Sequence, residues 1–258
     1  MNILCFTLSG KTAFFKKPEV NSYVSFTYGN IHKIALMGIF GAVLGYGGYT
    51  AKWNAGGGMK KTGKTGNMEK SFPEFYERLS GIHVAVAPRA ERGFIRKKIQ
   101  VFNNSVGYAS GEQGGNLIVK EQWLEEPSWD VYVLLDCEEA SMLCDRILAG
   151  KCVYIPYLGK NDHFADISDV RVEEACECKD GEGNIAALFP KEKGRIGAVD
   201  DFYEEQAAVT YKYEEKLPYE LDAWTNNYIL QSFVYTDAAV SWEKQLVYCV
   251  GKKNIMFY

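Results

Sequence analysis

Apolar residues in the first 158 positions fall into segments whose spacing separates strands from helices. Short runs rich in β-branched and aromatic residues predict strands, and apolar residues three and four positions apart predict helices. In chain order, the predicted elements are a strand at 2–8, a helix at 31–45, strands at 82–87 and 129–135, a helix at 138–148 and a strand at 152–158. Asn30 suits the N-cap of the first helix.

Three glycines, Gly38, Gly41 and Gly45, share one face of that first predicted helix. Each glycine costs helix stability, by up to about 1 kcal/mol relative to alanine. Close packing of the helix on a sheet, or close approach of another backbone, would offset this cost. The same apolar segment, 34–49, is 16 residues long, shorter than the roughly 20 that a spanning helix needs. We therefore expect a buried helix and no membrane contact.

A second pattern lies between the two predicted central strands. Strand-like segments at 99–102 and 117–123 flank a stretch of Asn, Ser and Gly residues at 103–116. Two strands around such a tip predict a protruding β-hairpin, at about 99–123. The element order is then that of an α+β, ferredoxin-like (RRM-like) βαββαβ domain over residues 1–158, with this thumb hairpin inserted.

The pattern weakens in the C-terminal part of the chain. Strand candidates remain at 171–178, 207–213, 228–235 and 245–250. The sequence therefore predicts a smaller, β-rich C-terminal region over residues 159–258.

Charge divides the chain more sharply than hydropathy does. Residues 1–120 contain no Asp and carry 12 Lys and 4 Arg against 6 Glu, a net charge of +10, whereas the whole chain has a net charge of −4. Basic stretches at 11–17 and 89–98 adjoin predicted strands and contain interleaved phenylalanines. Clustered cations beside stacking surfaces are typical of single-stranded nucleic-acid binding, although such runs also occur as solvated faces.

A phosphate-binding pattern also occurs. Residues Gly58–Thr65 match GxxxxGK[ST], and the strand 131–136 ends in Asp136 as a magnesium-binding strand would. A P-loop leaves a buried strand and enters a helix, and neither context is present around these residues. A P-loop nucleotidase is therefore an alternative, and not the preferred interpretation.

Candidate catalytic residues are few. The three histidines, His32, His83 and His163, form no recognisable triad with Ser, Cys or Asp. His32 and Lys33 at the start of the first helix could act on RNA as a base and a charge stabiliser.

The seven cysteines form no secreted framework, which favours free thiols in the cytoplasm, and the lone CxC at 176–178 is a weak metal signal. We expect no cofactor and no metal.

Several stretches resemble one protein family. They are Phe6–Pro18, with an opening strand followed by an aromatic-basic-Pro signature, Ser25–Gly29 with the helix at 36–45, and Lys151–Lys160. On these residues the chain resembles the RAMP-superfamily subunit of type I CRISPR surveillance complexes (Cascade), the fifth Cas family, most like subtype I-B. The tail at 247–258 is similar as well.

The resemblance implies a cytoplasmic subunit that binds and caps the 5′ handle of crRNA in antiviral defence. Its thumb, near residues 103–116, would hook the RNA 5′ end. It also implies contacts to the Cascade backbone subunit and large subunit, and through them an indirect relation to target DNA. One branch of this family cleaves precursor crRNA with a Tyr and a Lys-His pair. This chain has no Lys-His dipeptide, so we expect a non-catalytic subunit, with a metal-independent endoribonuclease as the alternative.

The expected RNA contacts follow from charge and ring chemistry. The expected phosphate contacts are Lys11, Lys16, Lys17, Lys33, Arg89, Arg92, Arg96, Lys97 and Lys98. The expected base contacts are Tyr28, His32, Asn103, Asn104 and Tyr108.

Overall fold

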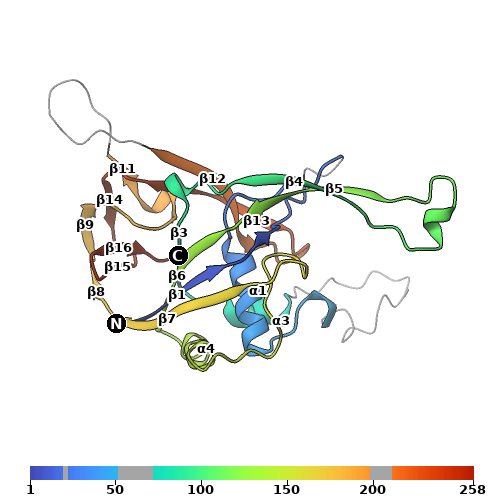
Figure 1. Ribbon diagram of the computed structural model, residues 1–258. Helices are drawn as coiled ribbons and strands as arrows, with labels where there is room; N and C mark the ends of the chain where they lie inside the picture. The colour runs from blue at the N-terminus through green and yellow to red at the C-terminus, as the bar shows by residue number, and fades with distance from the viewer. Residues whose placement is uncertain (20–22, 52–71, 198–210) are drawn as a thin grey trace, which may run out of the picture.

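A four-stranded antiparallel sheet organises the protein, as Figure 1 shows for a computed structural model that describes residues 1–19, 23–51, 72–197 and 211–258. In sheet order its strands are β3 (Val84–Pro88), β6 (Ser128–Leu134), β1 (Asn2–Ser9) and β7 (Asp166–Glu174). Each neighbouring pair is antiparallel. Helices α1 (Lys33–Leu44) and α4 (Glu138–Leu148) follow β1 and β6 in the chain. The protein is therefore α+β, as the sequence predicts.

Both faces of this sheet are covered, which explains why β1 is almost continuously apolar. Leu4, Phe6 and Leu8 belong to one buried cluster with α1, and the rings of Phe6 and Phe40 lie 6.4 Å apart. The alternate residues Ile3 and Cys5 belong to a second cluster, formed with C-terminal strands. A strand between two layers needs apolar residues at every position, because its side chains alternate between the faces.

The glycines of α1 serve different purposes. A Cβ on Gly41 would lie 2.8 Å from Phe75 Cβ of helix α3 (Glu74–Leu79), so this glycine permits the close approach of the two helices. Gly45 ends the helix in the left-handed conformation, with φ +90°. Nothing lies within 4 Å of the position that a Gly38 Cβ would occupy. The prediction of close packing along the face is therefore correct at Gly41 and wrong at Gly38.

The predicted strand at 152–158 is wrong, and β7 takes the fourth position in the sheet. Instead, Val153 and Tyr154 donate backbone hydrogen bonds to the carbonyls of Val43 and Ala42, near the end of α1. The last carbonyls of a helix have no partner within the helix, so they can bind a neighbouring segment in this way. The side chains of Val153, Tyr154 and Ile155 are exposed, although their apolar run suggested a buried strand.

A long hairpin leaves the body of the protein (Figure 1). It consists of β4 (Lys97–Asn103) and β5 (Ile118–Glu125), which pair antiparallel from Lys97↔Leu124 to Asn103↔Ile118. At its base the short strand β2 (Thr12–Ala13) pairs with the other edge of β5. The hairpin is therefore attached to the body through the N-terminal segment.

The remaining strands form three small antiparallel sheets. Their members are β10 (Phe189–Pro190), β13 (Tyr228–Thr236) and β12 (Lys212–Leu221); β11 (Arg195–Ile196), β14 (Val240–Glu243) and β9 (Asp180–Gly183); and β16 (Lys253–Met256), β15 (Val247–Val250) and β8 (Cys176–Glu177). Leu217 of β12 and Phe233 of β13 belong to the same buried cluster as α1. The predicted division after residue 158 stays a prediction, and the segments on either side of it share one core.

Candidate nucleic-acid interface

The base of the hairpin joins segments that are distant in the sequence. Thr12 of β2 pairs with Glu125 on one edge of β5, and Lys97 of β4 pairs with Leu124 on the other edge. A parallel bridge between Ser25 and Glu121 adds a third segment, which continues to Thr27. The basic stretches 11–17 and 89–98 therefore meet at β5, although more than 70 residues separate them.

Four of the predicted cations at this base form no ion pair with any described residue. They are Lys11, Lys16, Arg96 and Lys97. The first three are exposed and Lys97 is half-buried. Burial lowers the pKa of Lys97, while the nearby Glu215 raises it and Lys17 lowers it. These four side chains are the ones that can contact phosphates without first leaving an internal carboxylate.

Three other predicted cations, Lys98, Arg92 and Arg89, already form ion pairs with carboxylates. Lys98 Nζ lies 3.6 Å from Glu125 and Arg92 Nε lies 3.8 Å from Glu91. Arg89 Nε lies 2.8 Å from Asp130 Oδ1, and its guanidinium also reaches Asp169 of β7 at 3.8 Å. Arg89 is therefore held against the end of the central sheet and is not part of the hairpin base.

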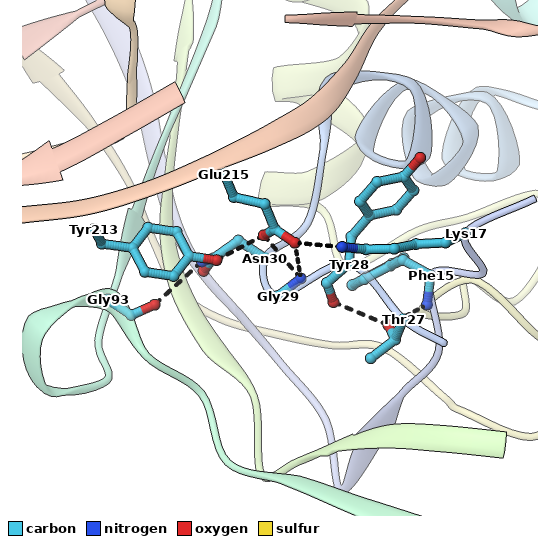
Figure 2. Close-up of polar contacts among 9 residues, drawn as sticks. All are labelled: Phe15, Lys17, Thr27, Tyr28, Gly29, Asn30, Gly93, Tyr213 and Glu215. Atoms are coloured by element: carbon cyan, nitrogen blue, oxygen red, sulfur yellow. Dashed lines mark hydrogen bonds and ion pairs between the residues drawn. The ribbon is translucent and has the colours of Figure 1, made fainter. Parts of the chain in front are cut away.

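Lys17 is the most firmly held of the predicted contacts (Figure 2). Its Nζ lies 3.0 Å from Glu215 Oε1 and 5.0 Å from the centre of the Tyr28 ring. Glu215 also accepts hydrogen bonds from the backbone N–H of Gly29, at 2.9 and 3.0 Å, and from the Tyr213 hydroxyl, at 2.6 Å. Only 13% of the Glu215 side chain is exposed. This cluster ties β12 to the segment that precedes α1.

Asn30 stabilises the same segment, in a different role from the N-cap that the sequence predicts. Its amide Nδ2 donates to the Gly93 carbonyl at 3.1 Å, and its Oδ1 accepts from Trp129 Nε1 at 2.9 Å. The side chain is fully buried. Asn30 therefore links the start of α1 to the 3-10 turn before β4 and to strand β6, and Figure 2 shows its bond to Gly93.

Three predicted RNA contacts are buried: Tyr28, His32 and Lys33. His32 is the N-cap of α1, where its Nδ1 accepts from the Ala35 N–H at 3.2 Å. The rings of Phe15, Tyr28 and Tyr228 surround it at 5.4 to 5.8 Å. Burial lowers the pKa of His32 to about 3, so it is uncharged at neutral pH. Its expected base contact does not fit this position.

Lys33 and Tyr28 are also withdrawn from the surface. Lys33 Nζ lies 5.2 Å from the centre of the Tyr219 ring, and burial lowers the pKa of Lys33 to about 8. The Tyr28 hydroxyl is buried and has no hydrogen-bond partner among the described residues. Their expected contacts with a phosphate and a base do not fit either, because an RNA could not reach these atoms in this conformation.

The hairpin tip carries the last three predicted contacts. Tyr108 is 85% exposed. The Asn103 amide donates to Asn116 Oδ1 at 3.2 Å, and its Oδ1 accepts from the Ser105 N–H. The Asn104 N–H donates to the Leu117 carbonyl. The two asparagines thus shape the loop, while the ring of Tyr108 remains open for stacking.

One face of the hairpin base is supported by residues that were not predicted as RNA contacts. Trp123 Nε1 donates to Glu121 Oε2 at 2.8 Å, and the His163 ring meets Trp123 edge-on at 4.6 Å. Lys160 pairs with Glu121 at 3.2 Å and lies 5.0 Å from the Phe102 ring centre. The two-residue alternation of β4 and β5 was the available signal, because it places Phe102 and Trp123 on one face.

A pocket of about 410 Å³ lies beside Lys16. Its lining residues are Lys16, Pro18, Tyr49, Asn226, Asn227 and Tyr228. Only Lys16 was predicted as a contact. The sequence offered only a weak sign of the other members, the Asn-Asn turn before the strand candidate at 228–235.

Three further sequence expectations concern a P-loop, a metal site and a membrane span. The P-loop-like segment Gly58–Thr65 lies outside the described residues. Within the described ranges, no group of three or more His, Cys, Asp or Glu side chains is arranged to hold a metal ion. Among the helices in these ranges, none combines the length and the apolar character needed to cross a bilayer.

Comparisons with known proteins give matches of structure alone. No protein-family model matches the sequence, and no curated protein matches it. The structure is similar to a solved CRISPR protein from Archaeoglobus fulgidus, with a TM-score of 0.51, 9% identity and coverage of 99% of both chains. It is also similar to a chain of a CRISPR RNA-guided surveillance complex, with a TM-score of 0.50, 13% identity and coverage of 92% of this chain and 90% of that chain. At these identities the likeness concerns the fold, which this chain shares with CRISPR proteins over nearly its whole length.

Proposed function

We propose that this protein is a non-catalytic subunit of a type I CRISPR surveillance complex (Cascade), in which it binds and caps the 5′ handle of crRNA. It would belong to the RAMP superfamily and the fifth Cas family, most like subtype I-B, and would link the backbone and large subunits in antiviral defence. Because a fold alone does not determine function, the proposal rests on what the surface offers.

The central sheet supports the ferredoxin-like part of this proposal. The chain order β1, α1, β3, β6, α4, β7 is strand, helix, strand, strand, helix, strand. The sheet order β3-β6-β1-β7 places the first and third of its strands in the middle. This arrangement is the one expected of a βαββαβ unit.

The observation that carries the proposal is the hairpin with its unpaired cations. β4 and β5 extend away from the body (Figure 1), and the backbone of Lys11, Arg96 and Lys97 lies at their base beside the end of β5, with Lys16 on the neighbouring segment that bridges to Thr27. The tip carries the exposed ring of Tyr108. Cations that contact phosphates, followed by a ring on which a base can stack, are the two elements that hold single-stranded RNA.

Exposed apolar side chains support a role within an assembly. On the hairpin face away from Trp123, Ile99, Val101 and Ile118 are each more than half exposed. Val153 and Ile155 are exposed in the segment beside the end of α1. Apolar groups gathered in this way on a monomer's surface commonly mark protein interfaces.

Shortening the hairpin tests the proposal. Asn103 and Ile118 are a cross-strand pair, so residues 104–117 can be replaced by an Asn-Gly turn that closes the two strands directly. The described side chains removed include none of the buried core, and we therefore expect an unchanged melting temperature. Affinity for crRNA carrying its 5′ handle should fall about tenfold or more, because base stacking on Tyr108 is lost.

A narrower variant is Tyr108→Ala in the full-length hairpin. It should reproduce much of the loss of affinity for handle RNA. Affinity for an RNA of the same length without the handle sequence provides the reference. A shortened protein that folds and binds handle RNA as tightly as the parent would contradict the proposal.

The endoribonuclease alternative can be tested separately with His32→Asn. Asparagine can cap α1 in place of histidine but cannot act as a base. Incubation of precursor crRNA with the parent protein in EDTA should give no specific cleavage. Specific cleavage by the parent that disappears in His32→Asn would instead establish the nuclease, and ATP binding abolished by Lys64→Ala would establish the nucleotidase.

A further inference from the structure

We propose that the pocket beside Lys16 binds a single ribonucleotide of the RNA, with its base against Tyr49 or Tyr228, its base edge at the Asn227 carboxamide, and its phosphate at Lys16. This inference rests on the proposed function and adds a defined subsite to it. At about 410 Å³ the pocket lies within the size range of small-ligand sites.

The composition of the lining favours a nucleotide. It combines two aromatic rings, two carboxamides and one ammonium group, and none of the six lining residues is acidic. Rings can stack on any base, and the Asn227 carboxamide can both donate and accept hydrogen bonds at a base edge. The ammonium group supplies the charge that a phosphate requires. A cationic ligand would find no carboxylate in this lining.

The turn that carries the asparagines is built firmly. Asp222 Oδ1 accepts hydrogen bonds from the Trp224 N–H at 3.1 Å and from the Thr225 N–H and hydroxyl, both at 2.8 Å. The Asp222 N–H donates to the Asn227 carbonyl, and the Asn227 N–H donates to the Thr225 hydroxyl. These bonds fix the backbone of Asn226 and Asn227 before any ligand binds, which lowers the entropic cost of binding.

The two tyrosines are supported from behind. Tyr228 contacts the buried His32 ring edge-on at 5.4 Å, and Tyr49 meets Phe75 of α3 in the same way at 5.9 Å. Burial, with a smaller contribution from Tyr228, raises the pKa of Tyr49 to about 12, and burial also raises the pKa of Tyr228. Both hydroxyls therefore stay protonated at neutral pH, so they add no negative charge where a phosphate would bind.

Lys16 is positioned by the backbone and left uncommitted by its side chain. An antiparallel bridge to Thr27 fixes its main chain, and its exposed ammonium group pairs with no described carboxylate. Its neighbour Lys17 is already bound to Glu215. Lys16 is therefore the cation that can serve the pocket.

The experiment uses the full chain with a radiolabelled handle RNA and, separately, the four ribonucleoside 5′-monophosphates. Tyr49→Ala and Asn227→Ala should each lower the affinity for the RNA about tenfold, since stacking and edge contacts have this magnitude. Ultraviolet cross-linking of the RNA should label peptides that contain Tyr49 or Tyr228. One of the four monophosphates should compete better than the others, because the Asn227 carboxamide reads a base edge.

The matched control is Tyr46→Ala. Tyr46 lies three residues before Tyr49 and stacks on Arg78 outside the pocket, with the guanidinium 4.9 Å from its ring centre. We expect Tyr46→Ala to bind RNA as the parent does.

The outcomes separate the two proposals. Pocket variants that bind RNA normally, while the shortened hairpin does not, would overturn the nucleotide pocket and leave the proposed function intact. A parent protein that binds no handle RNA would overturn both. If a polyglutamate peptide protects Tyr49 from chemical modification and RNA does not, the pocket would be assigned to an acidic protein segment. This result would also overturn the inference.

Discussion

Lys17 and Glu215 form an ion pair of 3.0 Å although 198 residues separate them in the sequence. Lys17 belongs to the basic part of the chain and Glu215 to the acidic part. The division of charge along the sequence is therefore partly neutralised inside the fold. What remains open at the hairpin base is the smaller set of Lys11, Lys16, Arg96 and Lys97, which is why the basic surface has a definite location.

The first prediction concerns Glu215→Gln. The carboxylate accepts from Lys17, from the Gly29 N–H and from the Tyr213 hydroxyl, and an amide cannot accept all three while its NH₂ faces one of the donors. The free energy of unfolding should fall by about 1–3 kcal/mol, the cost of leaving partly buried polar groups unsatisfied. Urea denaturation at pH 7 measures this change.

The control for that measurement is Glu182→Gln, an exposed position on strand β9 that should change stability by less than about 0.5 kcal/mol. Equal stabilities of the Glu215 and Glu182 variants would show that the Glu215 cluster does not stabilise the fold.

Much of the architecture was readable from local patterns. The strands at 2–8, 82–87 and 129–135 and the helix at 138–148 match β1, β3, β6 and α4 to within two residues. Each is rich in apolar residues, and a Gly, Pro, Ser or Asp residue lies at its end or within two residues after it. The fourth strand was misplaced because Val153, Tyr154 and Ile155 are as apolar as a buried strand, whereas β7 contains exposed charged residues at the sheet edge. Composition cannot show which of two such segments joins the edge.

The site was less accessible from the sequence because it depends on burial between distant segments. The N-cap of α1 is His32 and not Asn30, since Asn30 is drawn to Gly93 and Trp129. Neither partner is close in the sequence, so no local rule could assign these roles. Similarly, Asn227 reaches the pocket beside Lys16 only through the β12–β13 turn. Charge runs predicted where cations would gather, and tertiary contacts decided which of them remain unpaired.

The second prediction concerns pH. Burial lowers the pKa of His32 to about 3, below its value of 6.5 in the unfolded chain. As the pH falls from 6.5 towards 3, the unfolded state binds a proton that the folded state does not bind. The free energy of unfolding therefore falls by up to about 1.4 kcal/mol per pH unit on account of His32.

His32→Asn removes this titration while retaining a capping side chain. Between pH 6 and pH 4 the stability of His32→Asn should fall less steeply than that of the parent, as measured by urea denaturation at each pH. The difference between the two proteins isolates His32, because the other titrating groups are common to both. Parallel pH profiles would argue that His32 is solvated and charged in the folded state.

The third prediction concerns Lys33. Burial, with a smaller contribution from Lys193, lowers the pKa of Lys33 from 10.5 to about 8. At pH 7 the buried ammonium group therefore opposes folding. Lys33→Met should raise the free energy of unfolding by about 1 kcal/mol, after the loss of the contact with the Tyr219 ring is subtracted. Because the folded pKa is depressed, this advantage should shrink as the pH rises from 8 to 10.5.

Thermal unfolding at pH 7 and pH 10 measures both parts of that prediction. Handle-RNA affinity should be unchanged in Lys33→Met, since Lys33 is buried. A Lys33→Met variant that is less stable than the parent at pH 7 would contradict the expected cost of the buried ammonium group. A variant that loses RNA affinity would return Lys33 to the expected phosphate contacts.

The fourth prediction separates the hairpin base from the rest of the basic surface. Each phosphate contact with single-stranded RNA contributes about 0.7 to the slope of log K against log salt concentration. Lys16→Gln combined with Lys97→Gln should therefore reduce that slope by about 1.4 and weaken binding at low salt. Arg89→Gln should leave the slope unchanged, because Arg89 is held by Asp130 and Asp169. Binding measured by fluorescence anisotropy from 50 to 300 mM salt, roughly the range over which such slopes are resolved, decides between them. An equal effect of Arg89→Gln would mean that the RNA follows the end of the central sheet, and not the base of the hairpin.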